Sequence, residues 1–274
     1  MNRANCPICS APAQLEHEMP DVFLFSCDDC NHRFSLIKDS HEEEYDKDYY
    51  LNKHKNWFEN PDFELYEKVA FHISEASSRT ILDVGCGNAN LLRFLHTKDP
   101  NLDLTGIDLS SVQGFENVKI INQSFIDHNW TSNYDLIASL ATIEHITEIE
   151  KFVNKVYEKL NSNGLFFVMT MNDDSILYKT ARLLRKLGFP KPFNRLYDKH
   201  HVNHFSHQSL KKLLISKGFK IKTIYLHNVP LKSLDIEHSN FLEYHINKVS
   251  VSILFLLGLL SGKTYLQSIV AQRE

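Results

Sequence analysis

The sequence contains little glycine or proline and lacks a long uninterrupted apolar run. Only 9 Gly and 8 Pro occur among 274 residues, which excludes collagen-like and low-complexity chains. Residues 1–10 lack the apolar core of a signal peptide, which argues against secretion. The longest apolar run, at 249–260, contains Ser250 and Ser252 and is shorter than the roughly 20 residues that cross a bilayer. We therefore expect a soluble cytoplasmic protein, and leave open peripheral contact with the inner membrane surface.

The composition is that of a globular protein with an uneven distribution of charge. Hydrophobic residues make up 43% of the chain, and 18 Phe and 11 Tyr supply apolar side chains for a core. The net charge of −4 disfavours a general nucleic-acid partner. Residues 179–222 nevertheless contain 12 Lys or Arg and the single acid Asp198. This stretch fits an amphipathic helix over 176–187 with a solvated basic face, a site for a phosphate group, or contact with an anionic membrane.

Four of the five cysteines form two C-x-x-C pairs with 17 residues between them. They are Cys6, Cys9, Cys27 and Cys30. This spacing predicts a tetrahedral zinc site, in which each pair supplies two thiolates. Because four protein ligands leave no position for water, the predicted zinc is structural. Disulfides or redox chemistry are the alternative, which a cytosolic setting disfavours. His17 and His32 are surplus to the site, and we expect them at the surface.

Strands alternate with helices from residue 80 onward. The expected strands cover residues 80–84, 102–109, 117–122, 134–140 and 165–171. An amphipathic helix is expected over 148–160, whereas the short interval at 110–117 leaves no room for the usual helix. This alternation predicts a doubly wound, mostly parallel sheet, in which ligands bind at the carboxyl ends of the strands.

The turn after the first strand, residues 83–89, reads D-V-G-C-G-N-A. A dinucleotide-binding turn would have glycine at position 90, where this chain has Asn90, and the Lys-Ser or Lys-Thr of a P-loop is absent. The turn resembles motif I of class I S-adenosylmethionine-dependent methyltransferases, with Ala89 in place of the last glycine.

Further segments are similar to motifs of this methyltransferase family in the same order along the chain. They are residues 124–125, 134–135 with 141–146, 160–165, and 204–210 with 218–219. A four-cysteine ribbon is usual in one small-molecule branch, so the resemblance covers nearly the whole chain. It implies an α/β fold with a doubly wound, mostly parallel sheet of the seven-stranded, Rossmann-like type, and a small N-terminal zinc ribbon.

We divide the chain accordingly into four parts. They are a ribbon at 1–38, a linker and helical segment at 39–78, a methyltransferase core at 79–228 with a basic insertion at 174–207, and a C-terminal helical segment at 229–274. The linker is rich in acids and aromatics. Its aromatics are expected to pack on the core or to line the substrate site; they are Tyr45, Tyr49, Tyr50, Trp57 and Phe58.

The resemblance implies S-adenosylmethionine as the cofactor and assigns its contacts. Gly85 and Gly87 let the backbone approach it, Asp83 supplies a carboxylate near its positive charge, and Asp108 accepts hydrogen bonds from the ribose hydroxyls. The other expected contacts are Cys86, Leu109, Ser124, Phe125 and Leu140. The missing helix after the second strand predicts a more open adenosine pocket and weaker cofactor affinity.

Two histidines are candidates for a general base, which a hydroxyl or carbon acceptor requires. His145 lies just beyond the fourth strand, and His201 belongs to a cluster with His200, His204 and His207. A packing role for His145 and a structural loop for the cluster are the alternatives. The spacing of the cluster also permits a metal ion, with Asp198 as its nearest acid.

The sequence therefore predicts methyl transfer to a small-molecule acceptor, with the accepting atom and the oligomeric state left open. A sugar, a quinone-like compound and a lipid-linked intermediate all remain, and the acceptor is allowed a phosphate group. A zinc-ribbon rRNA base methyltransferase is one alternative, although the net acidity and the absence of a dense basic or aromatic ribbon surface disfavour nucleic acid. A non-catalytic protein that keeps the cofactor fold and binds a partner is the other.

Overall fold

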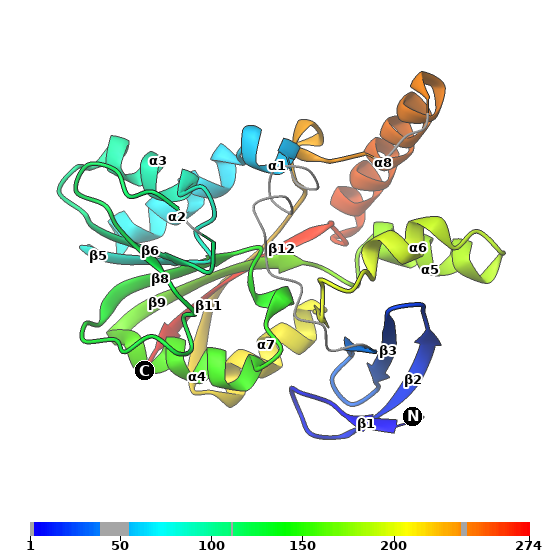
Figure 1. The fold of residues 1–274 in the computed structure, drawn as a ribbon, viewed down its shortest axis with the longest axis horizontal. Helices are drawn as coiled ribbons and strands as arrows, with labels where there is room; N and C mark the ends of the chain where they lie inside the picture. The colour runs from blue at the N-terminus through cyan, green and yellow to red at the C-terminus, as the bar shows by residue number, and fades with distance from the viewer. Residues whose placement is uncertain (1–2, 39–54, 111, 237–239) are drawn as a thin grey trace.

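A sheet of seven strands lies at the centre of the computed structural model (Figure 1). The structure describes residues 3–38, 55–110, 112–236 and 240–274. The strand order is β11-β12-β9-β8-β5-β6-β7. The strands are β5 (Thr80–Val84), β6 (Asp103–Asp108), β7 (Lys119–Asn122), β8 (Tyr134–Leu140), β9 (Leu160–Met171), β11 (Phe219–His227) and β12 (Leu266–Arg273). Strands β5 to β9 pair in parallel, and only β12 runs antiparallel to its neighbours β9 and β11. The predicted doubly wound, mostly parallel α/β fold is confirmed.

Helices cover both faces of this sheet, which explains why a central strand such as β9 has an uninterrupted apolar run, LFFVM at residues 165–169. On one face α2 (Phe63–Glu75) and α3 (Asn90–Lys98) pack on Ile81, Leu136 and Phe167. On the other face α4 (Ile149–Lys159) and α7 (His207–Ser216) pack on Leu82, Ile137 and Phe166 (Figure 1). All six strand side chains are fully buried.

The C-terminal segment, which we expected to be helical, differs from that expectation. Residues 229–274 contain the short 3-10 helix η3 (Leu231–Ser233) and the helix α8 (Phe241–Ser261), but they end in strand β12. β12 lies between β9 and β11, and the first six of its eight residues are buried. Because its sequence, LQSIVAQR, neither alternates apolar with polar residues nor forms an apolar run, its pattern did not indicate a strand.

Helix α8 is also longer than the apolar run suggested. Its 21 residues include Ser250 and Ser252, and the Ser252 hydroxyl donates to the Lys248 carbonyl oxygen at 2.7 Å. The helix is long and apolar enough to cross a membrane by length and composition, so our expectation that the run is too short was wrong. As expected, the described residues between β6 and β7 contain no helix.

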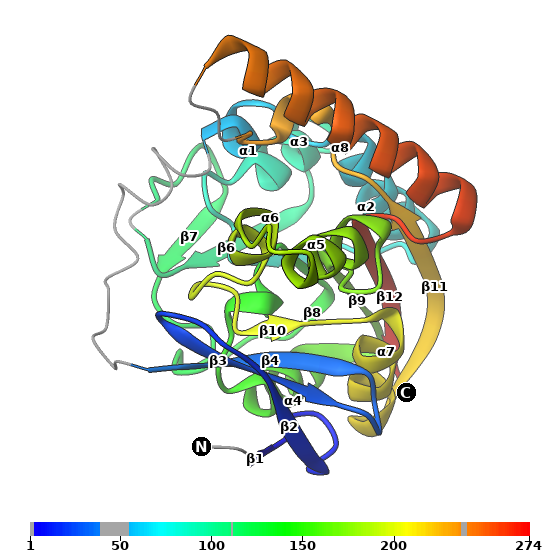
Figure 2. The same cartoon turned by 90° about the vertical axis from the view of Figure 1, so that its right-hand side faces the viewer.

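The N-terminal ribbon is an antiparallel sheet joined to the core by a strand from far along the chain. Its own strands are β1 (Arg3–Asn5), β2 (Pro12–Glu18), β3 (Val22–Cys27) and β4 (His32–Ile37). The two-residue strand β10 (Asn203–His204) pairs with β4 and completes a five-stranded sheet (Figure 2). His32, expected at the surface, is instead fully buried at this junction, where its ring lies 3.2 Å from Asn203 Oδ1.

A buried carboxylate strengthens the same junction. Asp173, just after β9, accepts hydrogen bonds from Arg33 of β4 at 2.6 Å, from Arg182 of α5 (Ile176–Lys186) at 3.0 Å, and from the Tyr197 hydroxyl. Burial alone would raise the pKa of Asp173, but the guanidinium groups of Arg182 and Arg33 hold it below its ordinary value. The short helix α6 (Lys191–Leu196) packs beside α5 and completes the insertion.

Replacing Asp173→Asn should lower the free energy of unfolding by about 3 kcal/mol, because the largely buried Arg182 loses this carboxylate partner while Arg33 keeps its ion pair with Glu16. Urea denaturation measures this change. The matched control is Glu67→Gln, which breaks an exposed ion pair with Lys98 and should cost less than about 1 kcal/mol. Equal losses in the two variants would contradict the proposed strength of the Asp173 junction.

Candidate functional site

A cavity of about 310 Å³ lies at the carboxyl ends of the central parallel strands. The last residues of β5, β6 and β8, which are Val84, Asp108 and Leu140, all line it. Trp57 and Phe58 of α1 (Lys55–Glu59) also line it, so these two linker aromatics contact the site. Tyr45, Tyr49 and Tyr50 lie outside the described residues.

The glycine turn needs a backbone conformation and a closeness that a side chain would prevent. Gly85 has φ +73°, and a Cβ there would lie 2.2 Å from the hydroxyl oxygen of Thr142. Gly87 has φ +50°, and its Cβ would lie 2.8 Å from the Phe58 ring. Ala89 also has a left-handed conformation, with φ 58°, although it stands where the family motif has glycine. The turn therefore keeps the geometry of the motif at a strain cost on the order of 1–2 kcal/mol at Ala89.

Two carboxylates flank this turn. Asp108 accepts hydrogen bonds from the Gly87 backbone N–H at 2.9 Å and from the Ser110 N–H and hydroxyl at 2.8 and 2.6 Å. Burial, together with the negative charge of Asp108, raises the pKa of Asp83 to about 7. A cation placed in the cavity would stabilise the ionised form of Asp83 and lower that pKa again.

All nine residues that the sequence predicted for the cofactor line this one cavity. Besides the two carboxylates and two glycines, they are Cys86, Leu109, Ser124, Phe125 and Leu140. Convergence was predictable because the carboxyl ends of neighbouring parallel strands meet at one edge of the sheet. Of the described residues that line the cavity, none is Lys or Arg, so the basic stretch 179–222 contributes no phosphate-binding cation to it.

The two candidate bases also meet at the cavity. His145, in the 3-10 helix η2 (Ile143–His145), and His201 have ring centroids 4.8 Å apart. His145 Nδ1 lies 2.7 Å from the carbonyl oxygen of His200. Since a carbonyl oxygen only accepts, Nδ1 carries the hydrogen, and in the neutral form of the ring the lone pair lies on Nε2. The ring therefore has the tautomer of a base that acts through Nε2.

Sequence reasoning did not single out Glu144, which lies beside these histidines. Its carboxylate is buried and accepts a hydrogen bond from the Thr170 hydroxyl at 2.9 Å, while Oε1 has no hydrogen-bond partner among the described residues. Burial raises the pKa of Glu144. Glu144, His145 and His201 offer ligand atoms within 4.8 Å of one another, a set that could hold a metal ion. The only available signal was its place next to His145 in the E-H pair.

The rest of the histidine cluster has other roles. Asp198 accepts from the backbone N–H groups of His200 and His201 at 3.0 and 3.1 Å, which shapes the loop. The Val202 N–H donates to the Glu144 carbonyl oxygen at 2.9 Å. His204 is buried at the ribbon junction, with its Nε2 3.1 Å from the Ser35 hydroxyl. The cluster is therefore divided between the cavity and the ribbon.

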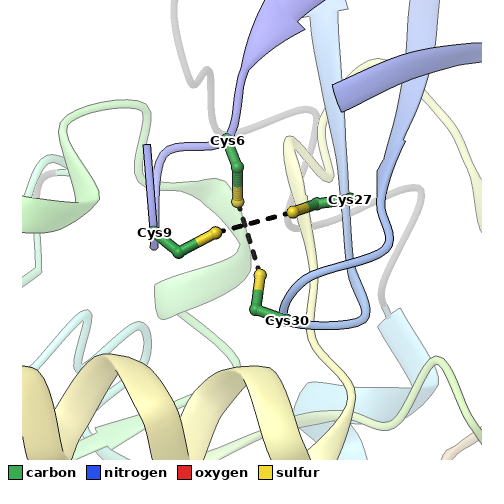
Figure 3. Close-up of side chains that lie close together, drawn as sticks. All are labelled: Cys6, Cys9, Cys27 and Cys30. Carbon is green, nitrogen blue, oxygen red and sulfur yellow. Dashed lines mark hydrogen bonds between the residues drawn. The ribbon is translucent and has the colours of Figure 1, made fainter. Parts of the chain in front are cut away.

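The four ribbon cysteines converge on one point (Figure 3). The Sγ atoms of Cys6 and Cys30 are 3.5 Å apart, as are those of Cys9 and Cys27, and no disulfide links them. Tetrahedral zinc with Zn–S bonds of about 2.3 Å places sulfur atoms about 3.8 Å apart, so the cluster fits a structural zinc ion. Hydrogen bonding between Cys6 and Cys30 lowers the pKa of Cys6 and raises that of Cys30, as expected for two thiols that share one proton.

A family model described as a methyltransferase domain matches residues 54–224. The chain belongs to this methyltransferase family. The ubiquinone biosynthesis O-methyltransferase of Rickettsia canadensis (strain McKiel) is 28% identical over 116 residues, which are 39% of this chain and 49% of that protein. The (S)-tetrahydroprotoberberine N-methyltransferase of Eschscholzia californica is 29% identical over 113 residues, 37% of this chain and 31% of that protein. The matches thus span half or less of the length of these relatives.

Solved structures share the fold of this methyltransferase domain. The plantazolicin methyltransferase BpumL, in complex with a triazolic desmethylPZN analog and SAH, superposes with a TM-score of 0.57 at 16% identity, covering 84% of this chain and 92% of that one. A SAM-dependent methyltransferase from Archaeoglobus fulgidus gives a TM-score of 0.54 at 18% identity, covering 82% and 99%. At such low identity, these likenesses establish the fold alone.

The cysteine cluster should bind Co²⁺ with the absorption of a thiolate-to-metal charge transfer. Cys27→Ser should weaken the binding at least about tenfold, because one of four thiolate ligands is lost. Cys86→Ser is the matched control, since Cys86 is also a buried free cysteine but lies outside the cluster. Metal titration followed by absorbance distinguishes the two. Undiminished binding by Cys27→Ser would contradict the four-thiolate site.

Proposed function

We propose that this chain transfers a methyl group from S-adenosylmethionine to a small, largely apolar acceptor. The observation that carries the proposal is a single cavity where a left-handed glycine turn, two carboxylates and an oriented histidine meet. A relative named as a ubiquinone biosynthesis O-methyltransferase and another named as an N-methyltransferase support a small-molecule acceptor.

The residues present fit the cofactor. Asp83 would face its positive charge, and Asp108 would face its ribose hydroxyls. The turn at Gly85 and Gly87 would let the protein backbone approach the cofactor closely. Because the Ser110 hydroxyl already donates to Asp108, it would have to rotate away for both ribose hydroxyls to bind there. When bound, S-adenosylmethionine supplies an electrophilic methyl group on its sulfonium sulfur.

The chain's own residues then have two tasks. The first is to hold the acceptor in line with the methyl group and exclude water; proximity of this kind can lower a barrier by about 7–11 kcal/mol. Trp57, Phe58, Met171 and Tyr265 supply apolar and aromatic walls for this task. With no Lys or Arg among the described lining residues, these walls favour a quinone-like or aromatic acceptor over a phosphorylated sugar.

The second task is to remove a proton from a hydroxyl acceptor. His145 would accept it at Nε2, while its Nδ1–H stays hydrogen-bonded to the His200 carbonyl oxygen. That carbonyl stabilises the positive ring formed in the step. The buried carboxyl of Glu144 and the ring of His201 lie beside it and would orient the acceptor.

Replacing Gly85→Ala should weaken binding of S-adenosylhomocysteine at least about tenfold. Thr142, which the new methyl group would meet, is held by hydrogen bonds to the carbonyl oxygens of Val84 and Leu140, so the turn must move instead. Gly188→Ala is the matched control, because Gly188 has φ +89° and nothing within 4 Å of its Cβ position. Titration calorimetry measures both affinities. Unchanged affinity in Gly85→Ala would argue that the cofactor does not bind at this turn.

Replacing His145→Ala should lower kcat for a phenolic or catechol acceptor by about 10²–10⁴-fold while S-adenosylhomocysteine affinity stays within about threefold. An acceptor panel that also contains amines, with release of S-adenosylhomocysteine as readout, measures this. His96→Ala is the control, since His96 pairs with Glu116 away from the cavity. Full activity of His145→Ala on hydroxyl acceptors excludes it as the base. Cofactor binding without turnover on any acceptor would favour the non-catalytic alternative.

A further inference from the structure

Helix α8 presents an apolar surface to solvent, which we call the α8 surface. Only Phe255 and Gly258 of this helix are buried. The exposed large apolar residues that form the surface are Phe241, Leu242, Ile246, Val249, Ile253, Leu256, Leu257, Leu259 and Leu260. Figure 2 shows the helix along the outside of the molecule. Of the most apolar 18-residue stretch of α8, 11% is buried, so α8 is not the core helix of a globular protein.

The helix is defined at both ends despite its few contacts. The Asn240 side chain accepts a hydrogen bond from the Glu243 N–H at 2.9 Å at the start, and Gly262 ends the helix with φ 65°. These are regular N-terminal and C-terminal caps. The exposed apolar side chains therefore form a surface of fixed shape. Exposure of such a surface to water is unfavourable.

The chain path shows how such a helix would meet a membrane. The chain leaves the central sheet at His227 of β11 and returns at Leu266 of β12, and these two residues are direct partners in the antiparallel ladder. A 21-residue helix is about 31 Å long. Since both connections lead back to the same point of one globular domain, α8 is suited to lie along a bilayer surface and not to cross it.

The neighbouring insertion offers further exposed apolar side chains and positive charge. Helix α5 packs against α8, and at its end Leu183, Leu187 and Phe189 are exposed. Three lysines are also exposed: Lys186 ends α5, Lys191 begins α6, and Lys263 follows the end of α8. Residues 175–197 contain no Asp or Glu, and α8 contains a single acid, Glu243.

We propose that the α8 surface, together with the end of α5, attaches this protein to the surface of an anionic phospholipid bilayer. The apolar side chains would enter the boundary between headgroups and acyl chains, and the lysines would pair with lipid phosphates. Charge complementarity favours this occupant over a second copy of the chain. A two-fold interface on this face would bring the cations of both copies together, and among the described residues of α8 and of 175–197 only Glu243 is an acid that could balance them.

Flotation of the full chain with vesicles tests the proposal. The protein should float with vesicles that contain phosphatidylglycerol, and less with pure phosphatidylcholine, with binding weakened by salt. The double variant Val249→Asp and Ile253→Asp should lose at least about tenfold in partitioning. Both side chains are more than half exposed, at 57% and 54%, so the fold should persist.

Two controls make the result decisive. Ile215→Asp changes an equally exposed apolar residue, at 51%, on α7 and should leave vesicle binding unchanged. The double variant Lys186→Gln and Lys191→Gln should reduce the preference for phosphatidylglycerol and leave the remaining vesicle binding unchanged. Failure of the wild-type chain to bind either vesicle overturns the proposal, as does an equal loss in Ile215→Asp. A dimer in light scattering that Val249→Asp and Ile253→Asp dissociate, without vesicle binding, would assign the surface to a second copy.

Discussion

The pairing of β4 with β10 is the contact through which the ribbon and the cavity depend on each other. It joins the four-cysteine ribbon to residues 203–204, directly after the loop that carries His201. The Ser35 N–H donates to the Val202 carbonyl oxygen at 2.9 Å, and the Val202 N–H donates to Glu144 at the same distance. A continuous chain of backbone hydrogen bonds thus runs from the ribbon to the residues around the cavity. The ribbon is therefore part of the site's support and not an independent appendage.

Because of this arrangement, the predicted zinc would stabilise more than the ribbon in which its four ligands lie. A metal in the cluster would fix the two C-x-x-C turns, and the second turn, at Cys27 and Cys30, connects β3 to β4. Because β4 in turn carries Arg33 to the buried Asp173, order in the ribbon is transmitted to the end of β9. Short strands such as β10 are too weak to hold this geometry alone, so the buried ion pairs and the metal would act together.

The sequence determined the central sheet and the cavity well because both depend on local, repetitive signals. Apolar runs gave the parallel strands, and the end of each strand gave the cavity residues, since parallel topology brings these ends together. The glycine turn was readable because Gly85 requires both a left-handed backbone and an absent Cβ. Even Ala89, which departs from the motif, adopts the conformation that the motif's glycine would.

Features that depend on contacts between distant segments could not be read in this way. A strand of two residues carries no periodicity, so β10 was invisible, and with it the burial of His32. The sequence gives a basic insertion at 174–207, but not that Arg182 is committed to Asp173 and Tyr197. In the sequence, Glu144 is an acid next to His145 that carries no sign of burial. Its position in the interior is evident only in the fold, where Thr170 of β9 lies beside it.

The position of α8 in the fold connects the α8 surface to the cavity. The helix is inserted between two hairpin partners, so it can be added without changing the register of the sheet. Val229 and Ser233 precede it, Tyr265 and Leu266 follow it, and all four line the cavity. The two connections that hold α8 to the domain are thus also walls of the site. A partner or membrane bound to α8 would therefore lie near the cavity, and a change in the tilt of the helix would move residues that line it.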